Sequence, residues 1–258
     1  EKLVLATGAT PRALPAGIGG DLDGVLTVRD KRDADRLMGE MKPGRKLLVI
    51  GGGYIGLEAA AVARKAGLDV TLIEMADRIL QRVASADTAA IMRDVHRANG
   101  VSIIEKTGLT RLHGKDGHVT SAELSDGTVL DVDFVIVGIG VTPNDRLARD
   151  SGLDSGNGIL VDSYTRTSDP DIHAVGDCAS QPWEGGRVRL ESVQNAVDQA
   201  EAAAVVLTGE EKAYAPKPWF WSDQYDVKLQ IAGYNAGYDE TVLRPGQREG
   251  SYSIWYFR

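Results

Sequence analysis

The sequence predicts an α/β fold that contains a parallel sheet covered by helices and ends in a β-rich segment. Three observations support this prediction. Residues 46–74 alternate strand, glycine-rich turn, helix and strand, and two later apolar runs each end in a glycine turn. Near Tyr214 the composition changes to aromatic, strand-like segments. Strands that alternate with helices are typical of a parallel sheet covered by helices.

The β-α-β pattern of residues 46–74 is complete. Leu47–Ile50 and Val70–Ile73 are apolar runs, as expected for parallel strands buried on both faces. Tyr54–Ala66 is compatible with a helix, and Gly67 suits the end of that helix. The order of these elements predicts a unit that binds a dinucleotide at its first turn.

Three glycines form the motif G-x-G-x-x-G at the turn into the helix. Gly51 allows the tight turn, Gly53 lets a pyrophosphate approach the backbone, and Gly56 lets helix and strand pack closely. An ordinary glycine turn is the alternative for the motif alone. Glu74 ends the second strand about twenty residues later, where a carboxylate can accept hydrogen bonds from ribose hydroxyls. Because an acid repels a 2′-phosphate, we expect NAD rather than NADP.

Composition narrows the class of protein. The chain has 258 residues, of which 43% are hydrophobic and 26% charged, as in globular domains. A net charge of −8 argues against nucleic acid or an anionic membrane as the main partner. No apolar run approaches the ~18 residues of a membrane span. The single cysteine, Cys178, excludes an internal disulfide within these residues and fits a reducing, cytoplasmic compartment.

Short elements precede the β-α-β unit. The chain starts at Glu1 without methionine and ends within a strand-like run, so we expect an internal segment of a longer protein. Leu3–Gly8 is an apolar strand that enters a glycine turn, and Pro11–Gly24 is expected to be a linker. Val25–Val28 is a brief strand, and Arg29–Met41 is compatible with a solvated helix.

A helix and a small meander are expected after the unit. Asp87–Ala98 is the expected helix, with Ser85 or Asp87 as its cap and His96 on its surface. From Val101 the hydrophobic period changes to two, which predicts an antiparallel meander. The expected strands of the meander are 101–104, 110–112, 118–123 and 128–132.

Two further apolar strands end in glycine turns. Phe134–Val137 enters Gly138-Ile-Gly140, which places backbone at the carboxyl edge of the sheet, where ligands bind in such folds. Ile172–Val175 ends in Gly176-Asp177. This aspartate could accept hydrogen bonds from a polyol such as a ribityl chain, or it could cap a turn. An alanine-rich helix is expected at 190–207, beginning near Glu191-Ser192. An aromatic stretch at 219–224 and three strand-like runs at 227–231, 241–243 and 251–257 follow.

Four motifs occur in the order VIGGGYIGLE, GIGVTPN, TSDPDIHAVGDCA and PWFWSDQYDVKLQIAG. With them the chain resembles the FAD-dependent, NADH-oxidising ferredoxin reductases of the putidaredoxin- and rubredoxin-reductase type. The resemblance covers essentially the whole chain. GGGYIG and GD are shared with the wider pyridine nucleotide-disulfide oxidoreductase group, whereas PWFWSDQYD is far more specific.

The resemblance implies a Rossmann-like NAD domain inserted in an FAD domain that is incomplete here, followed by a truncated α+β C-terminal domain. The implied FAD domain is 1–19 and 143–214, the NAD domain is 20–142, and the C-terminal domain is 215–258.

The resemblance also implies the site residues, and no metal ligand is among them. The residues implied to touch FAD are Thr7, Gly8, Arg29, Gly176, Asp177, on the ribityl chain, and Val193. The residues implied to touch NAD are Gly51, Gly53, Tyr54, Ile55, Gly56, Glu74, Gly138 and Gly140. Two residues are our catalytic candidates: Trp221 near the flavin edge, and Glu58 near the nicotinamide, for which a surface helix glutamate is the alternative.

The implied function is an NADH-dependent ferredoxin reductase of oxygenase electron-transfer chains. NADH passes a hydride to FAD, which then releases single electrons to a ferredoxin-type [2Fe-2S] protein or a rubredoxin. No side chain needs to act as a nucleophile or an acid–base catalyst. Ferredoxins are mostly acidic, as this chain is, and Arg187 and Arg189 are expected to be a solvated pair rather than a docking patch.

Three alternatives stay open at this point. A disulfide reductase of the same superfamily is disfavoured by the aromatic stretch at 219–224. A non-catalytic, NAD-responsive flavoprotein resembling apoptosis-inducing factor is disfavoured by the net charge of −8. The chain could also be a stable core that binds NAD but not FAD.

Overall fold

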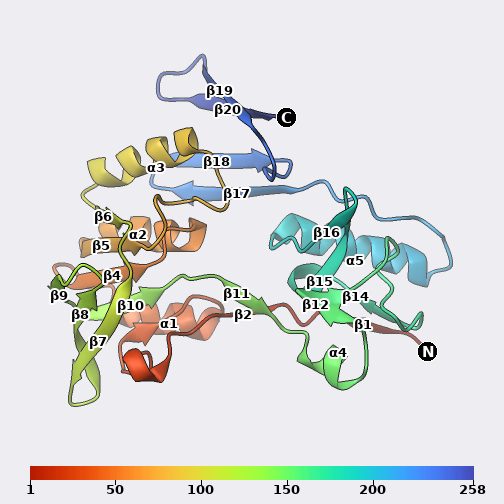
Figure 1. Cartoon of the computed structure of the whole chain (residues 1–258), viewed down its shortest axis with the longest axis horizontal. Coiled ribbons are helices and arrows are strands. Elements are labelled where there is room, and N and C mark those ends of the chain that lie inside the picture. Colours follow the sequence, from red (N-terminus) through yellow and green to blue (C-terminus); the bar gives the residue numbers. More distant parts are fainter. The chain divides into compact units, whose positions relative to one another are not determined.

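The computed structural model describes all 258 residues and divides into two compact units (Figure 1). Unit 1 consists of residues 1–10, 141–221 and 229–234. Unit 2 consists of residues 11–140, 222–228 and 235–258. Each unit is therefore assembled from segments that are far apart in the sequence.

Unit 2 is built on a five-stranded parallel sheet with the order β3-β10-β4-β5-β6. From β4 the chain proceeds outward through β5 and β6, and it then returns to the other side of β4 as β10. Such a reversal of direction creates a crevice at the carboxyl ends of the strands. The strands are β3 (Val25–Leu26), β4 (Lys46–Ile50), β5 (Asp69–Glu74), β6 (Ser102–Glu105) and β10 (Phe134–Val137).

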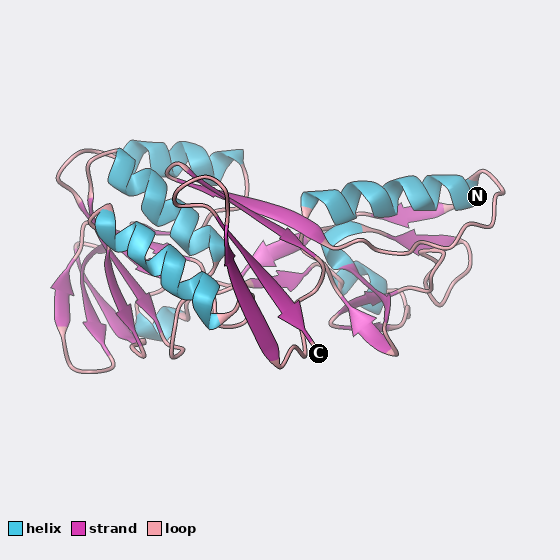
Figure 2. Cartoon of the chain, turned by 90° about the horizontal axis from the view of Figure 1, so that it is seen from above, coloured by secondary structure: helices cyan, strands magenta, loops and turns pink.

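Helices cover one face of this sheet and a meander covers the other. Alternate residues of β4 and β10 point to opposite faces, as strand geometry requires. Leu47 and Phe134 belong to the core that includes residues of all three helices, whereas Leu48 and Val135 belong to the core under the meander. Figure 2 shows the helices on one side of the strands. The helices are α1 (Lys31–Glu40), α2 (Tyr54–Lys65) and α3 (Ala86–Ala98), and the meander is β7 (Leu109–Lys115), β8 (His118–Leu124) and β9 (Val129–Asp131).

The assignment of 101–104 to the meander is wrong. This segment is β6, which pairs in parallel with β5, so that Ile104 lies opposite Ile73. A period of two describes a strand of either kind, and the pairing partner depends on contacts far along the chain. The three remaining strands form the expected antiparallel meander.

Part of the expected linker is ordered against the meander. Within residues 11–24 a short 3₁₀ helix, η1 (Ala16–Ile18), precedes Gly19. A Cβ atom on Gly19 would lie 2.5 Å from the Leu112 carbonyl oxygen of β7, so the two segments are in close contact. The glycines in this linker thus serve packing as well as turning.

Side-chain caps explain where three of the four long helices begin. The side chains of Asp30, Ser85 and Ser192 each accept a hydrogen bond from the backbone N–H three residues later. Ser85 is therefore the cap of α3. The alanine-rich helix expected to begin near Glu191-Ser192 is α5 (Val193–Leu207), and Ser192 is its cap.

Unit 1 contains two small sheets around its own core. The predicted strand at 172–175 is β14, which pairs in parallel with β1. The core beneath these strands includes Leu5, Ile159 and Ala174. The elements are β1 (Leu3–Leu5), β12 (Ser155–Gly156), β13 (Gly158–Leu160), β14 (Ile172–Ala174), β15 (Ala179–Trp183), β16 (Gly186–Val188), α4 (Arg146–Asp150), α5 and the 3₁₀ helix η2 (Gly176–Cys178).

Three strand pairs complete the chain. The predicted strand-like runs near the end form two hairpins, and the second is held at the start of α3, where the Tyr256 hydroxyl accepts the Ser85 N–H at 3.0 Å. No helix is long and apolar enough to cross a membrane. The pairs are β2 (Ala9–Pro11) with β11 (Val141–Pro143), β17 (Trp219–Gln224) with β18 (Val227–Ala232), and β19 (Glu240–Pro245) with β20 (Tyr252–Phe257).

Candidate functional site

The glycine-rich turn lies at the carboxyl end of β4, beside the end of β10. Gly51 has φ +107°, and a Cβ atom there would lie 2.3 Å from the Gly138 carbonyl oxygen. A Cβ atom on Gly56 would lie 2.0 Å from the Gly51 carbonyl oxygen. At Gly53, by contrast, nothing lies within 4 Å of an added Cβ atom. The fold itself therefore explains two of the three glycines, and the space at Gly53 fits the approach of a pyrophosphate.

The start of α2 faces the same turn. Gly53 is the N-cap residue, and it has no side chain to accept hydrogen bonds from the first turn of the helix. Such helix ends bind anions through backbone N–H groups. Ile55, a predicted NAD contact on this helix, is exposed. Tyr54, another predicted NAD contact, has a hydroxyl that donates to the Val83 carbonyl oxygen at 3.3 Å. Burial raises the pKa of Tyr54 well above its usual value, so this hydroxyl keeps its proton.

Glu74 lies beside this turn at the end of β5. Its Oε2 accepts the Gly52 N–H at 2.7 Å, and its Oε1 accepts the Ala76 N–H at 2.7 Å. Each carboxylate oxygen has two lone pairs, so both can accept a further hydrogen bond. On the other side of the turn, Gly140 is exposed with φ +94° and nothing within 4 Å of an added Cβ atom. The structure thus brings the predicted NAD residues to one sheet edge.

Glu58 and His96 both have partners on β17. Glu58, on the second turn of α2, is half-buried, and its Oε1 lies 2.5 Å from the Ser222 hydroxyl. The prediction that His96 lies on the surface of α3 is wrong. His96 is 0% exposed, its Nε2 is 2.7 Å from Gln224 Oε1, and burial lowers the pKa of the imidazole. No local pattern around His96 shows this, because its partner is far along the chain.

Asp177 and the residues near it lie in unit 1. Asp177 is half-buried on η2, directly after β14. Gly176 has φ +75°, and its N–H donates to Gln199 Oε1 at 2.8 Å. Gln199, Gln181 and Asn195 are buried and form a chain of amide hydrogen bonds that ties α5 to this turn. Sequence reasoning missed these amides, although buried polar residues on an alanine-rich helix are a usable signal.

Thr7 and Gly8 are held by Asn144, the last residue of the motif GIGVTPN. The Thr7 hydroxyl donates to the Asn144 carbonyl oxygen at 2.6 Å, and the Asn144 Nδ2 donates to the Thr7 carbonyl oxygen at 2.8 Å. The Asn144 N–H donates to the Gly8 carbonyl oxygen at 2.9 Å. Asn144 belongs to the motif GIGVTPN, but the motif alone does not predict that its side chain fixes this turn.

The remaining candidates lie in different surroundings. Arg29 belongs to unit 2, directly before the cap of α1, whereas Thr7, Gly8, Gly176, Asp177 and the exposed Val193 belong to unit 1. Trp221 is 44% exposed on β17, and its ring centroid lies 5.3 Å from that of Trp219.

The interpretation of Arg187 and Arg189 as a solvated pair is wrong for Arg189, whereas Arg187 is exposed. The Arg189 side chain is 8% exposed and forms an ion pair with Glu191 at 2.6 Å. Arg187 donates to the carbonyl oxygens of Val161, at 2.6 Å, and Ser180. Both guanidinium groups therefore serve the fold of unit 1, because nearby carbonyl and carboxylate oxygens satisfy them.

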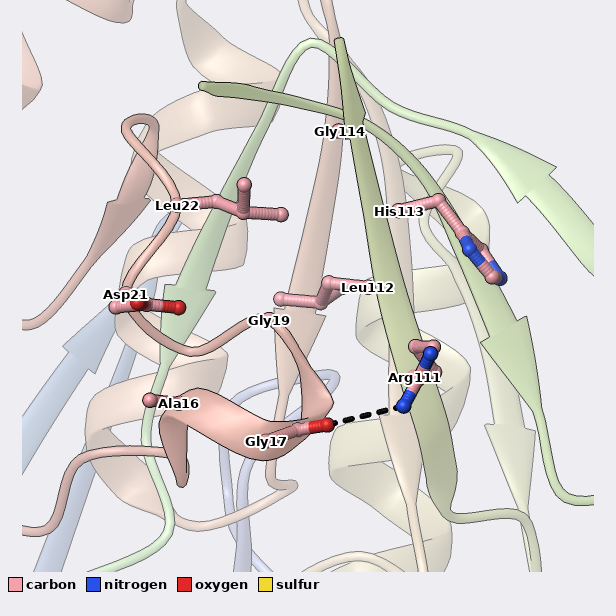
Figure 3. Close-up of a pocket in the computed structure, with 9 residues that line it drawn as sticks. All are labelled: Ala16, Gly17, Gly19, Asp21, Leu22, Arg111, Leu112, His113 and Gly114. Atoms are coloured by element: carbon pink, nitrogen blue, oxygen red, sulfur yellow. Dashed lines mark hydrogen bonds between the residues drawn. The ribbon is translucent and has the colours of Figure 1, made fainter. Parts of the chain in front are cut away.

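A shallow depression between η1 and β7 contains none of the predicted site residues (Figure 3). Arg111, on β7, donates to the Gly17 carbonyl oxygen of η1 at 3.1 Å. Elsewhere, no group of three or more His, Cys, Asp and Glu side chains is arranged to hold a metal ion. The glycine turn of unit 2 is thus the site with the clearest geometry.

Comparisons with known proteins agree with this geometry. Residues 1–200 match the family described as pyridine nucleotide-disulphide oxidoreductase, and residues 219–258 match the family described as reductase C-terminal. The chain is 46% identical over 259 residues to rhodocoxin reductase of Rhodococcus erythropolis, covering 100% of this chain and 60% of that protein. It is 43% identical over 261 residues to the 5,5′-dehydrodivanillate O-demethylase ferredoxin reductase subunit of Sphingobium sp. (strain NBRC 103272 / SYK-6), covering 100% of this chain and 63% of that protein.

The crystal structure of the covalent putidaredoxin reductase–putidaredoxin complex contains a chain with 40% identity and a TM-score of 0.95. The match covers 100% of this chain and 63% of that one. The chain thus spans about 60% of the length of these relatives. It is an α/β chain that belongs to the pyridine nucleotide-disulphide oxidoreductase family.

Proposed function

We propose that this chain is part of an NADH-dependent, FAD-containing ferredoxin reductase whose acceptor is a ferredoxin-type [2Fe-2S] protein or a rubredoxin. The observation that carries the proposal is the open space at Gly53, the N-cap residue of α2, next to the Gly52 N–H that holds the Glu74 carboxylate. This arrangement offers backbone N–H groups to a pyrophosphate and a carboxylate to a ribose. The names of the relatives, among them rhodocoxin reductase, support the choice of acceptor.

The proposed domains follow the sequence-based boundaries. Residues 20–142 bind NAD, residues 1–19 and 143–214 contribute to the FAD domain, and residues 215–258 belong to the C-terminal domain. The separation of residues 11–140 from residues 1–10 and 141–221 into two compact units supports this division. The match of residues 219–258 to a separate family supports the last boundary.

The proposed contacts give each residue a physical role. When bound, FAD accepts a hydride from NADH and supplies electrons singly to the acceptor. Glu74 binds the adenosine ribose and disfavours a 2′-phosphate, while Gly53 admits the pyrophosphate. Asp177 accepts hydrogen bonds from the ribityl chain, Glu58 lies by the nicotinamide, and Trp221 excludes water from the flavin edge. The single, buried thiol of Cys178 is consistent with a protein that functions in the reducing cytoplasm.

Anaerobic titration of the flavin-loaded protein with NADH tests the function. Flavin absorbance is expected to bleach with NADH, and added ferredoxin or rubredoxin is expected to restore it as the iron–sulfur or iron centre becomes reduced. Absorbance that persists with excess NADH would contradict the proposal. Reoxidation by a disulfide substrate, but by no iron protein, would instead support a disulfide reductase.

Glu74→Ala is expected to weaken NADH binding about tenfold and to narrow the preference for NADH over NADPH. The carboxylate supplies the ribose contact and the charge that repels a 2′-phosphate. Calorimetric titration with both dinucleotides measures the two effects. Glu74→Gln is the matched control, since it keeps an acceptor oxygen and removes only the charge. An unchanged NADH/NADPH ratio in both variants would count against Glu74 as the ribose ligand.

Asp177→Ala is expected to weaken FAD binding about tenfold, because the variant loses the proposed acceptor for ribityl hydroxyls. The ratio of flavin to protein absorbance after gel filtration is the measurement. Asp150→Ala is the control in unit 1, because Asp150 forms only an exposed ion pair with Arg146. Normal flavin content in Asp177→Ala would show that this aspartate only shapes its turn.

A further inference from the structure

Buried polar side chains follow one face of β17, and none of them belongs to the proposed cofactor contacts. Ser222 and Gln224 are 1% and 0% exposed, whereas Trp221 and Asp223 are exposed. Successive side chains of a strand point to opposite faces. The strand therefore turns its polar residues inward and its tryptophan outward, the reverse of the usual pattern for a covering strand.

Ser222 and Gln224 belong to a row of hydrogen bonds that runs from Tyr225 to Glu58. Ser222 Oγ lies 2.5 Å from Glu58 Oε1, and Gln224 Nε2 lies 2.9 Å from Ser222 Oγ. Gln224 Oε1 lies 2.7 Å from His96 Nε2, and the Tyr225 hydroxyl lies 3.4 Å from His96 Nδ1. The row thus joins α2, α3 and the first C-terminal hairpin through side chains only.

The chemistry of the groups gives the row a direction. A carboxylate only accepts hydrogen bonds, so the Ser222 hydroxyl donates to Glu58. Ser222 Oγ then accepts from the Gln224 amide, and the Gln224 oxygen accepts from His96 Nε2–H. Burial lowers the pKa of His96, which favours the neutral ring that this arrangement requires. Every donor points toward Glu58, and hydrogen bonds aligned in this way strengthen one another.

We propose that His96 and Gln224 are positioning residues that hold the Glu58 carboxylate, through Ser222, in the orientation needed at the nicotinamide end of NADH. This inference rests on the proposed function, which places the nicotinamide beside Glu58. The carboxamide of Gln224 separates the imidazole from the serine and does not relay protons as an imidazole or hydroxyl does. The row therefore orients Glu58 and does not deliver a proton to it.

The row also fixes which face of β17 points inward. Gln224 and Ser222 must both face α2 and α3 to make their hydrogen bonds, so Asp223 between them is held on the outward face. One polar row thus orients the Glu58 carboxylate and fixes which face of β17 points inward at residues 222–224.

Calorimetric titration with NADH tests the proposal in variants that break the row at constant volume. Gln224→Met removes both amide hydrogen bonds and is expected to raise the NADH dissociation constant about fivefold. In a Glu58→Met background, which has no acceptor for the Ser222 hydroxyl, Gln224→Met is expected to change the NADH dissociation constant less than about twofold, because its effect passes through the carboxylate. Gln230→Met is the matched control on the exposed face of β18, and it is expected to bind NADH as the unsubstituted protein does.

Ser222→Ala is the second variant. It removes one oxygen atom and, unlike Gln224→Met, leaves the hydrogen bond between His96 and Gln224 in place. The effect of Ser222→Ala on the NADH dissociation constant is expected to be similar in size and to vanish in the same way in the Glu58→Met background. If the two variants weaken NADH binding equally in both backgrounds, β17 affects NADH binding without Glu58, and the proposal would be overturned. Unchanged affinity in the Glu58 background for both variants would overturn it as well.

A long-range ¹H–¹⁵N spectrum of the imidazoles provides a readout that needs no cofactor. His96 is expected to be neutral at pH 7 with its hydrogen on Nε2, and its signals are expected to move in Gln224→Met but not in Gln230→Met. A ring with its hydrogen on Nδ1 would overturn the proposed direction of the row. Flavin reduction by NADH in the unsubstituted protein tests the proposed function separately, so the two failures are distinguishable.

Discussion

Gly53→Ala is expected to weaken NADH binding about 100-fold, or about 2.7 kcal/mol, while the fold stays intact. Nothing lies within 4 Å of a Cβ atom at this position, so the protein itself has room for the methyl group. That room is where we propose that the pyrophosphate approaches the start of α2. A methyl group there keeps the phosphate oxygens away from the backbone N–H groups.

The effect of Gly53→Ala on stability is expected to be small because two effects oppose each other. The backbone angles, φ −78° and ψ −179°, are allowed for alanine, which loses less entropy on folding by ~0.4–1 kcal/mol. Alanine is, however, a poorer N-cap residue than glycine. The melting temperature is therefore expected to stay within about 3 °C of the original value.

Calorimetry with NADH and a thermal melt measure the two properties of Gly53→Ala. Gly39→Ala is the matched control, because Gly39 is exposed on α1 and a Cβ atom there also meets nothing within 4 Å. This control is expected to bind NADH normally. Unchanged NADH affinity in Gly53→Ala would contradict a pyrophosphate at the turn.

The parts of the site that the sequence predicted well depend on local patterns. The glycine turn, the strands on either side of it and the carboxylate at position 74 lie within one β-α-β unit, so spacing along the chain determines their arrangement. The return of the chain as β10 was also recognisable, since its apolar run enters a second glycine turn. Gly51 and Gly138 meet there because Ile50 and Val137 are paired residues of adjacent strands.

The errors concern residues whose partners are distant in the sequence. His96 looked like a surface residue because its partner, Gln224, is 128 positions away. The segment 101–104 alternated like a meander strand, but its neighbour is β5. Arg189 looked solvated because nothing local shows that Asn157 and the Asp177 carbonyl oxygen lie beside it. Periodicity describes which side of an element is buried, but it does not identify what covers that side.

Gly56→Ala, only three residues from Gly53, is expected to destabilise the fold itself. The added Cβ atom would lie 2.0 Å from the Gly51 carbonyl oxygen and 3.3 Å from Val49 Cγ1. A backbone oxygen cannot rotate away as a side chain can, so α2 has to move off β4. The expected cost is about 3 kcal/mol of unfolding free energy, which lowers the melting temperature by about 6–12 °C.

The second substitution Val49→Ala separates the two contacts of Gly56→Ala. It relieves the side-chain contact but leaves the main-chain oxygen of Gly51 in place, so the double variant is expected to melt no higher than Gly56→Ala alone. Recovery of the melting temperature would show that side-chain crowding is the cause, and an unchanged melting temperature in Gly56→Ala itself would show that α2 does not pack this closely on β4. With Gly53→Ala, the same chemical change at two positions of one motif distinguishes a glycine that the ligand requires from a glycine that the fold requires. Because helix position and phosphate contact are linked through this turn, Gly56→Ala is expected to lose NADH affinity together with stability, whereas Gly53→Ala loses affinity alone.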